Sequence, residues 1–405
     1  MSLNPIGIAV PFFFGLLAVE WWLARGRGLR LHRMNDALAN LTCGLGDQLI
    51  GLFVGGLTLG LYMVTEANLG LFALAIDSPV VWIFGIFAVD FLYYCFHRFA
   101  HRVGIGWATH VVHHQSEDYN FAVALRQPWF TQLYAWLFYI PLALLGLPWE
   151  IYAASYAFNL IYQFWIHTEL IGKLGPVEWV MNTPSHHRVH HGINDPYIDK
   201  NYAGVFIIWD RLLGTFEEED ERVLFGTRKP LQNWNPWTAN TEPLLDLWRR
   251  SKATPDPGDK KRVWWAPPEW TAEGEQPGAG CPPPGRGYDR DIGPGVHTYA
   301  LGQLGVLVVL MTVLLTFEAY IPLAPKVLAS FFIMWTGVTW GGLFEQRRWA
   351  PSAEWIRLGT LVAVGFFLST LGPDFVVVGY GIAAIAITSA LALWRCRDDL
   401  VVRVS

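Results

Sequence analysis

Histidine dominates the chemistry that this sequence can perform. Ten of the twelve histidines lie between residues 97 and 191, where an even distribution would place about three. They form three clusters, HRFAH, HVVHH and HRVHH, and one further histidine stands alone between the second and third clusters. The ten are His97, His101, His110, His113, His114, His167, His186, His187, His190 and His191.

The spacing within the clusters suits metal binding. Residues three or four positions apart share one face of a helix, so each cluster can direct two or three imidazoles at one point. Neutral imidazole binds Zn, Cu, Fe and Ni, and a single tetrahedral Zn needs about four ligands. The nine histidines other than His186 therefore predict two metal ions. His186 is left open as a ligand, because only one of two adjacent histidines can easily point inward.

The elements that position these histidines are predicted to be membrane helices. The chain of 405 residues is 53% hydrophobic and 16% charged, compared with about 25% charged in soluble domains. Stretches approaching the roughly 20 apolar residues of a membrane span lie at 5–24, 43–64, 78–96, 128–147, 149–166, 297–317, 322–343, 355–372 and 374–394. The predicted fold class is an all-α integral membrane protein, a multi-span helical bundle.

Lys and Arg gather on alternate connections between the predicted spans, which predicts that the histidine segment faces the cytoplasm. We expect membrane spans at 1–77, a histidine-rich domain with a cytoplasmic helical cap at 78–253, a Pro/Gly-rich linker at 254–296 and an extra C-terminal span bundle at 297–405.

A net charge of −5 without a basic tract argues against nucleic acid as a partner. Four dispersed cysteines argue against a thiolate metal site.

Polar residues near the clusters are candidates for supporting the ligands or binding substrate. Metal-bound histidine usually donates its other N–H to a carboxylate or carbonyl. These candidates are Glu117, Asp118, Asn120, Glu169, Asp199 and Asn201, with Arg126 and Tyr202 as further polar candidates. Asp90 differs because a carboxylate within a span costs about 2.5–3.5 kcal/mol. It is predicted to orient a ligand, to line a substrate tunnel or to make a structural hydrogen bond.

The order HxxxH, HxxHH, HxxHH between membrane spans resembles the fatty acid hydroxylase and sterol desaturase superfamily over residues 78–220. Three further segments are similar to its alkylglycerol monooxygenase branch. These are HHQSEDYNFAVALRQ at 113–127, HTELI at 167–171 and HRVHHGINDPYIDKNYAGVFIIWDRLLGTF at 187–216. Arg102 departs from the pattern, since many relatives carry Glu after the HxxxH pair.

The resemblance implies that the nine histidines hold two irons, with tetrahydrobiopterin or another electron donor as reductant. O₂ and a membrane lipid would be the co-substrates. Hydroxylation of the carbon beside an ether oxygen gives a hemiacetal that separates into a fatty aldehyde and glycerol. A sterol or fatty acyl hydroxylase or desaturase, with the same ligands, is the alternative.

Two hypotheses come from other classes. A membrane metal transporter should place ionisable groups along several spans rather than in one layer. A metalloprotease should show HExxH, but the residue after the first histidine of each cluster is Arg98, Val111 or Arg188.

Overall fold

The computed structural model describes residues 5–275 and 287–400. Residues 276–286 of the predicted linker, together with 1–4 and 401–405 at the ends of the predicted terminal domains, lie outside the described residues.

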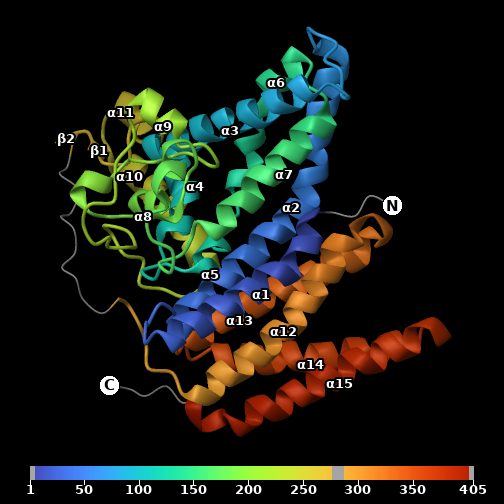
Figure 1. Cartoon of the computed structure of the whole chain (residues 1–405). Helices are drawn as coiled ribbons and strands as arrows, with labels where there is room; N and C mark the ends of the chain where they lie inside the picture. The colour runs from blue at the N-terminus through green and yellow to red at the C-terminus, as the bar shows by residue number, and fades with distance from the viewer. Residues whose placement is uncertain (1–4, 276–286, 401–405) are drawn as a thin grey trace. The chain divides into compact units, whose positions relative to one another are not determined.

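The described residues are overwhelmingly helical, which confirms the predicted fold class (Figure 1). The α-helices are α1 (Pro5–Gly26), α2 (Met34–Leu69), α3 (Pro79–Arg102), α4 (Gly104–His114), α5 (Phe121–Ala124), α6 (Ile140–Leu145), α7 (Trp149–Trp165), α8 (Pro184–His190), α9 (Ile208–Leu213), α10 (Pro236–Ala253), α11 (Pro257–Trp265), α12 (Pro294–Thr316), α13 (Leu323–Phe344), α14 (Ala350–Ser369) and α15 (Pro373–Arg395). Short 3-10 helices lie at Thr131–Leu133, Ala135–Tyr139, Gly175–Trp179, Asp195–Tyr197, Glu318–Tyr320 and Arg397–Leu400. One antiparallel pair joins β1 (Trp270–Thr271) to β2 (Gly274–Glu275).

Among the described residues, six helices are long and apolar enough to cross a membrane, so the protein is a multi-pass membrane protein. They are α1, α2, α3, α12, α13 and α15. The predicted span at 149–166 corresponds to the 17-residue α7, and the one at 355–372 overlaps α14 and extends three residues beyond its end. Neither α7 nor α14 is among the six. The predicted span at 43–64 is part of the longer α2.

The prediction of a span at 128–147 is wrong. Its helical part, Ala135–Leu145, is too short to cross a membrane and divides at Ile140 into a 3-10 and an α-helical segment. Pro141 has no N–H to give to the preceding turn. Before it, the Gln132 side chain donates to the backbone carbonyl of Asp47 in α2 (3.0 Å), which holds this segment against α2.

The described chain divides into two compact units. Of the described residues, the larger unit contains 12–232, 239–275 and 287–288, and the smaller contains 5–11, 233–238 and 289–400. Part of the predicted linker is ordered in the larger unit, as α11 and the β1–β2 pair.

In the larger unit, α3 packs against both α7 and α4. A buried cluster that includes Tyr62, Val89, Leu147 and Ile151 ties α2, α3 and α7 together. Gly106 lets α4 approach α3 closely, since a Cβ there would lie 2.7 Å from the carbonyl oxygen of Phe99. The close approach turns the HVVHH cluster of α4 towards the HRFAH cluster that ends α3.

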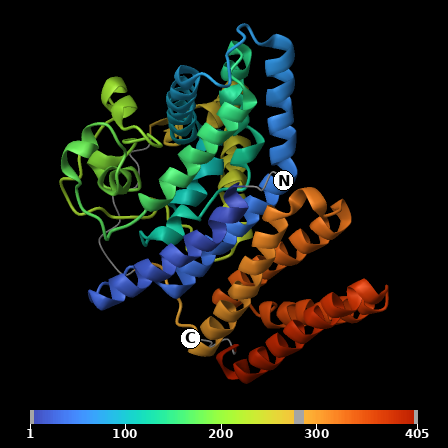
Figure 2. The same ribbon diagram turned by 45° about the vertical axis from the view of Figure 1, so that its right-hand side comes forward.

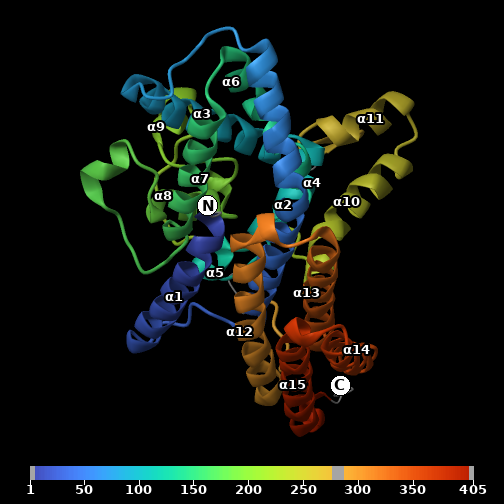
Figure 3. The ribbon, with the colours of Figure 1, turned by 90° about the vertical axis from the view of Figure 1, so that its right-hand side faces the viewer.

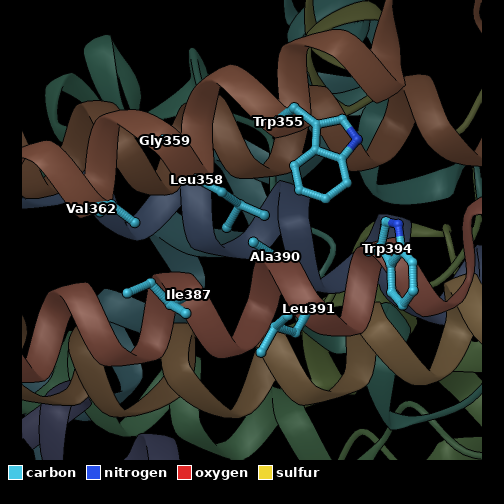
Figure 4. A pocket seen from close by; sticks show the side chains of 8 residues that line it. All are labelled: Trp355, Leu358, Gly359, Val362, Ile387, Ala390, Leu391 and Trp394. Atoms are coloured by element: carbon cyan, nitrogen blue, oxygen red, sulfur yellow. The ribbon is translucent and has the colours of Figure 1, made fainter.

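In the smaller unit, α14 and α15 run side by side as a helical hairpin (Figures 1 and 2). A buried Arg357–Glu354 ion pair (2.6 Å) and the hydroxyl of Tyr299 connect α14 to α12. An apolar groove of about 540 Å³ lies between α14 and α15, with Trp355 and Trp394 at one end (Figure 4).

Candidate metal centre

Nine of the ten clustered histidines meet inside the larger unit, in two groups. Each group has one ring nitrogen per residue within 4.8 Å of all the others. The first group is His97, His101, His110, His114 and His190, and the second is His113, His167, His187 and His191. All nine are at most 7% exposed.

Helical spacing explains how the histidines divide between the groups. In α4, His110 and His114 lie four residues apart and enter the first group, while His113 enters the second. In the HRVHH cluster of α8 and its C-cap, His187 and His191 enter the second group, while His190 enters the first. Side chains four residues apart point the same way and the third is rotated around the helix axis. Each of these two clusters therefore serves both groups.

The remaining ligand candidates come from the ends of two longer helices. His97 and His101 form one face of the last turns of α3 and join the first group. His167 lies two residues beyond the end of α7 and joins the second. The two groups adjoin, because the rings of His114 and His191 stack with centroids 4.4 Å apart.

The distances between ring nitrogens fit metal coordination. Nε2 atoms are 3.2 Å apart for His97 and His110, and 3.3 Å apart for His114 and His110. In the second group, Nε2 of His167 lies 3.2 Å from that of His113 and 3.0 Å from that of His187. Two nitrogens bound about 2.1 Å from one ion lie about 3.0–3.4 Å apart at angles between 90° and tetrahedral.

Four histidines have a fixed tautomer. The Nδ1 atoms of His97, His113, His167 and His190 lie 2.7–2.9 Å from backbone carbonyl oxygens. A carbonyl only accepts, so each Nδ1 carries the proton and each Nε2 presents its lone pair. Buried Nε2 atoms of His101, His190 and His191 have no hydrogen-bond partner. An unpartnered lone pair in the protein interior costs free energy, and a bound cation removes this cost.

Burial also keeps the imidazoles outside the membrane helices neutral. It lowers the pKa of His113 to about 4. Burial and the neighbouring imidazoles lower the pKa values of His114 and His191 well below the ordinary range. The neutral form is the one that binds metal, so the fold prepares the ligands before metal arrives.

The loop at 199–202 supplies two of the four carbonyls. Lys200 accepts from His190 and Tyr202 accepts from His97. The flanking Asp199 and Asn201 have φ of 59° and 54°, a left-handed conformation that Asp and Asn tolerate better than most residues. These two predicted supporting residues therefore contribute a backbone shape. In addition, the Asp199 carboxylate bonds to Arg102, and its Oδ1 lies 3.9 Å from Nδ1 of His101.

Asp90 anchors the next part of this loop through hydrogen bonds to groups other than the nine histidines. Its carboxylate accepts from the backbone N–H of Val205 (2.7 Å) and Phe206 (3.0 Å), from the indole of Trp209 (2.8 Å) and from Asn159 (2.6 Å). The described contacts match a structural hydrogen-bonding role, one of the three alternatives.

The remaining predicted carboxylates and Asn120 have described contacts other than with the nine imidazoles. Glu117 and Asp118 both bond to Arg33, Asn120 caps α5 through the N–H of Ala122, and Glu169 is exposed. His186 is buried but belongs to neither group. Its ring packs edge-on against Phe216, with centroids 5.4 Å apart.

Three supporting residues were not among those predicted from the sequence: Asp210, Gln163 and Lys200, whose backbone carbonyl accepts from His190 (2.9 Å). Asp210 accepts from the backbone N–H of Tyr202 (2.8 Å) and Ala203 (2.9 Å), which fixes the carbonyl that holds His97. Gln163 offers its backbone carbonyl to His167 (2.7 Å). The acceptor in Gln163 is the backbone carbonyl, which every residue has, so the residue type does not predict this contact. Of these residues, only Asp210 could have been found from the sequence, because it is an acidic residue within the apolar run VFIIWDRLLGTF.

Comparison with known proteins finds similar sequences over the histidine region. The fatty acid hydroxylase family profile matches residues 82–215. The alkylglycerol monooxygenase of Xenopus tropicalis is 39% identical over 359 residues, covering 86% of this chain and 79% of that protein. The alkylglycerol monooxygenase of Homo sapiens is 46% identical over 265 residues, covering 65% of this chain and 59% of that protein.

A shorter similarity, 30% identical over 147 residues, joins 33% of the chain to 41% of the ornithine lipid hydroxylase OlsE of Rhizobium tropici. No solved structure is significantly similar to the chain. The similarity to the frog enzyme extends over most of the length of both proteins and includes the histidine region. The chain therefore belongs to the alkylglycerol monooxygenase family.

Proposed function

We propose that the protein is an O₂-dependent, non-haem di-iron monooxygenase that hydroxylates the O-alkyl chain of an ether lipid and thereby cleaves it. The observation that carries the proposal is the pair of adjoining, buried imidazole groups in a chain of the alkylglycerol monooxygenase family. In the proposal, the first group of five histidines holds one iron and the second group of four holds the other.

The reaction balances with one lipid, one O₂ and one two-electron donor. One oxygen atom enters the C–H bond beside the ether oxygen, and the other leaves as water with two electrons and two protons from the donor. The resulting hemiacetal breaks its bond between carbon and ether oxygen, giving a fatty aldehyde and a glycerol hydroxyl. Tetrahydrobiopterin, or another two-electron donor, supplies the electrons.

Two bound irons would supply O₂ activation, and the protein supplies the rest. The α3, α4, α7 and α8 segments hold nine neutral imidazoles in a dry interior, and four of the imidazoles are locked by backbone carbonyls. Exclusion of water protects a reactive site from side reactions. The alkyl chain would reach the histidines laterally from the bilayer alongside α3. We place the centre at the cytoplasmic side, on the distribution of Lys and Arg between the connections.

The transporter hypothesis is less favoured by the geometry. The nine histidines gather at the ends of α3 and α7 and on short helices that follow them, rather than along several spans. Such a layer fits a reaction centre better than a path across the membrane.

The test compares two adjacent histidines. His187→Ala and His186→Ala are purified in detergent from iron-supplemented cells, and iron per chain is measured with the wild type. We expect about two irons in the wild type and in His186→Ala, and loss of iron from the second group in His187→Ala. Equal iron content in all three proteins would contradict the ligand assignment.

Substrate class is tested with a 1-O-alkylglycerol and the matched ester, with O₂ and with or without tetrahydrobiopterin. We expect fatty aldehyde from the ether only. Aldehyde formation with a different reductant and none with the pterin would reassign the donor. Oxidation of a sterol or acyl chain without ether cleavage would favour the alternative reaction.

A further inference from the structure

An exposed apolar surface lies on the histidine-bearing part of the larger unit, outside the six membrane helices. Two short segments form it, the 3-10 helix Gly175–Trp179 with its flanks and α9. We call it the apolar ledge, and its exposed members are Leu174, Val177, Trp179, Val180, Leu212 and Leu213. Trp179 is 74% exposed and Leu212 is 73% exposed. Contact of such a group of large apolar side chains with water is unfavourable and is unusual on a water-covered protein surface.

The two segments are joined by backbone hydrogen bonds. The N–H of Ile207 donates to the carbonyl of Val180 (2.9 Å), and Met181 and Phe206 form an isolated antiparallel bridge. Arg211 in α9 donates to the carbonyl of Glu178 (3.2 Å). The two segments of the ledge are therefore held together as one structural unit.

The ledge is attached to the side of a membrane helix. Trp209 of α9 contacts Phe91 and Phe87 of α3, with ring centroids 5.1 and 6.5 Å apart, and Phe206 stacks on Phe87 at 4.4 Å. Figures 1 and 3 show α9 beside α3. Phe91 and Phe87 precede His97 by six and ten residues, which is about 9 and 15 Å along the helix axis. The aromatic contacts therefore lie inside the span rather than beyond its end.

Polar groups near the ledge are already satisfied or lie at its edge. The Glu178 carboxylate accepts from the N–H of Leu174 (3.0 Å) and the hydroxyl of Thr183 (2.8 Å). The guanidinium of Arg211 stacks 3.7 Å above the ring of Phe216. Lys173 is paired with Glu218 (3.7 Å). Tryptophan with long basic side chains at the edge of an apolar surface is typical of the boundary between lipid headgroups and acyl chains.

We propose that the apolar ledge is inserted into the leaflet that adjoins the histidine centre and is covered by membrane lipid. The continuity of the ledge with the lipid-facing side of α3 selects the bilayer over a protein partner. Val180 and Met181 lead directly into Asn182, whose side chain donates to Ala203 (2.7 Å), and then into α8 with its histidines. The ledge thus holds the ligand-bearing loops at the depth of the lipid. This inference does not depend on which lipid is the substrate.

The test measures immersion directly. In a background with the native cysteines replaced by alanine, Trp179→Cys and Leu212→Cys are labelled with an environment-sensitive fluorophore and reconstituted in phosphatidylcholine vesicles. Asp220→Cys, whose side chain is 76% exposed beside the same loops, is the matched aqueous control. Iron content per chain checks that each variant is folded.

We expect a blue shift of label emission at the two ledge positions, quenching by acyl-chain nitroxide lipids and loss of quenching by aqueous iodide. The control should show the reverse. Iodide quenching at the ledge equal to that of the control would overturn the proposal. Cross-linking between two chains through Leu212→Cys, without nitroxide quenching, would assign the ledge to a second copy instead. The same readouts in lipid nanodiscs keep the test valid if one variant reconstitutes poorly.

Discussion

Asp210 provides the sharpest test of how the loop holds the first histidine group. Its Oδ1 accepts from the N–H of Tyr202 and from the hydroxyl of Thr215 (2.7 Å), and its Oδ2 accepts from the N–H of Ala203. In Asp210→Asn, the amide oxygen can keep the first two donors. The amide NH₂ then faces the N–H of Ala203, which is left without an acceptor.

The one hydrogen bond lost in Asp210→Asn sets the expected loss of stability. Loss of one hydrogen bond to a charged acceptor costs about 1.5–3 kcal/mol of unfolding free energy. The carbonyl of Tyr202, which holds Nδ1 of His97 at 2.8 Å, loses its fixed position. Removing such support from a metal ligand typically lowers metal affinity about 10–100-fold. We expect a loss in that range in the first group, with the second group little affected.

Competition with a metal chelator, on detergent-purified protein, measures the affinities of the two sites. Asp220→Asn, on an exposed side chain, is the control for losing one carboxylate. A folded Asp210→Asn protein with two unchanged affinities would refute the reasoning, because His97 would then need no support from this loop. A selective loss in the second group would refute the assignment of His97 to the first.

Two further predictions concern the second group. The buried guanidinium of Arg126 donates three hydrogen bonds, to the Val112 carbonyl (2.6 Å), Asn40 (2.9 Å) and Gln115 (2.7 Å). The ammonium in Arg126→Lys can replace one of them, and loss of the other two should lower the unfolding free energy by about 3 kcal/mol. Thermal melting and iron content should both fall, because the Arg126 carbonyl holds His113; an unchanged melting temperature with full iron would contradict this. In metal-stripped protein, His113 titrates at about 4 when folded and about 6.5 when unfolded, so the unfolded chain binds more protons between these values. Its unfolding free energy should therefore fall by about 3 kcal/mol for this residue as pH drops from about 6.5 to about 4, and a melting temperature independent of pH in that window would count against the burial argument.

The sequence by itself determined the chemistry and the fold class. The apolar stretches predicted a helical membrane protein because a membrane span must be apolar over its whole length, a property of local composition. The i, i+3, i+4 spacing predicted convergent imidazoles because helical geometry places such residues on one face whatever surrounds them. The family segments around His113, His167 and His190 were equally local.

Tertiary structure alone decided the division of the histidines into groups of five and four and the exclusion of His186. Both depend on how α4 and α8 are rotated against α3 and α7, which no local pattern encodes. The supporting contacts are the carbonyls of Arg126, Gln163, Lys200 and Tyr202, and a backbone carbonyl is the same in every residue. The break near Pro141 and the attachment of α9 to α3 likewise arise from packing between segments distant in sequence. Helix periodicity is a property of neighbours along the chain, whereas these features belong to neighbours in space.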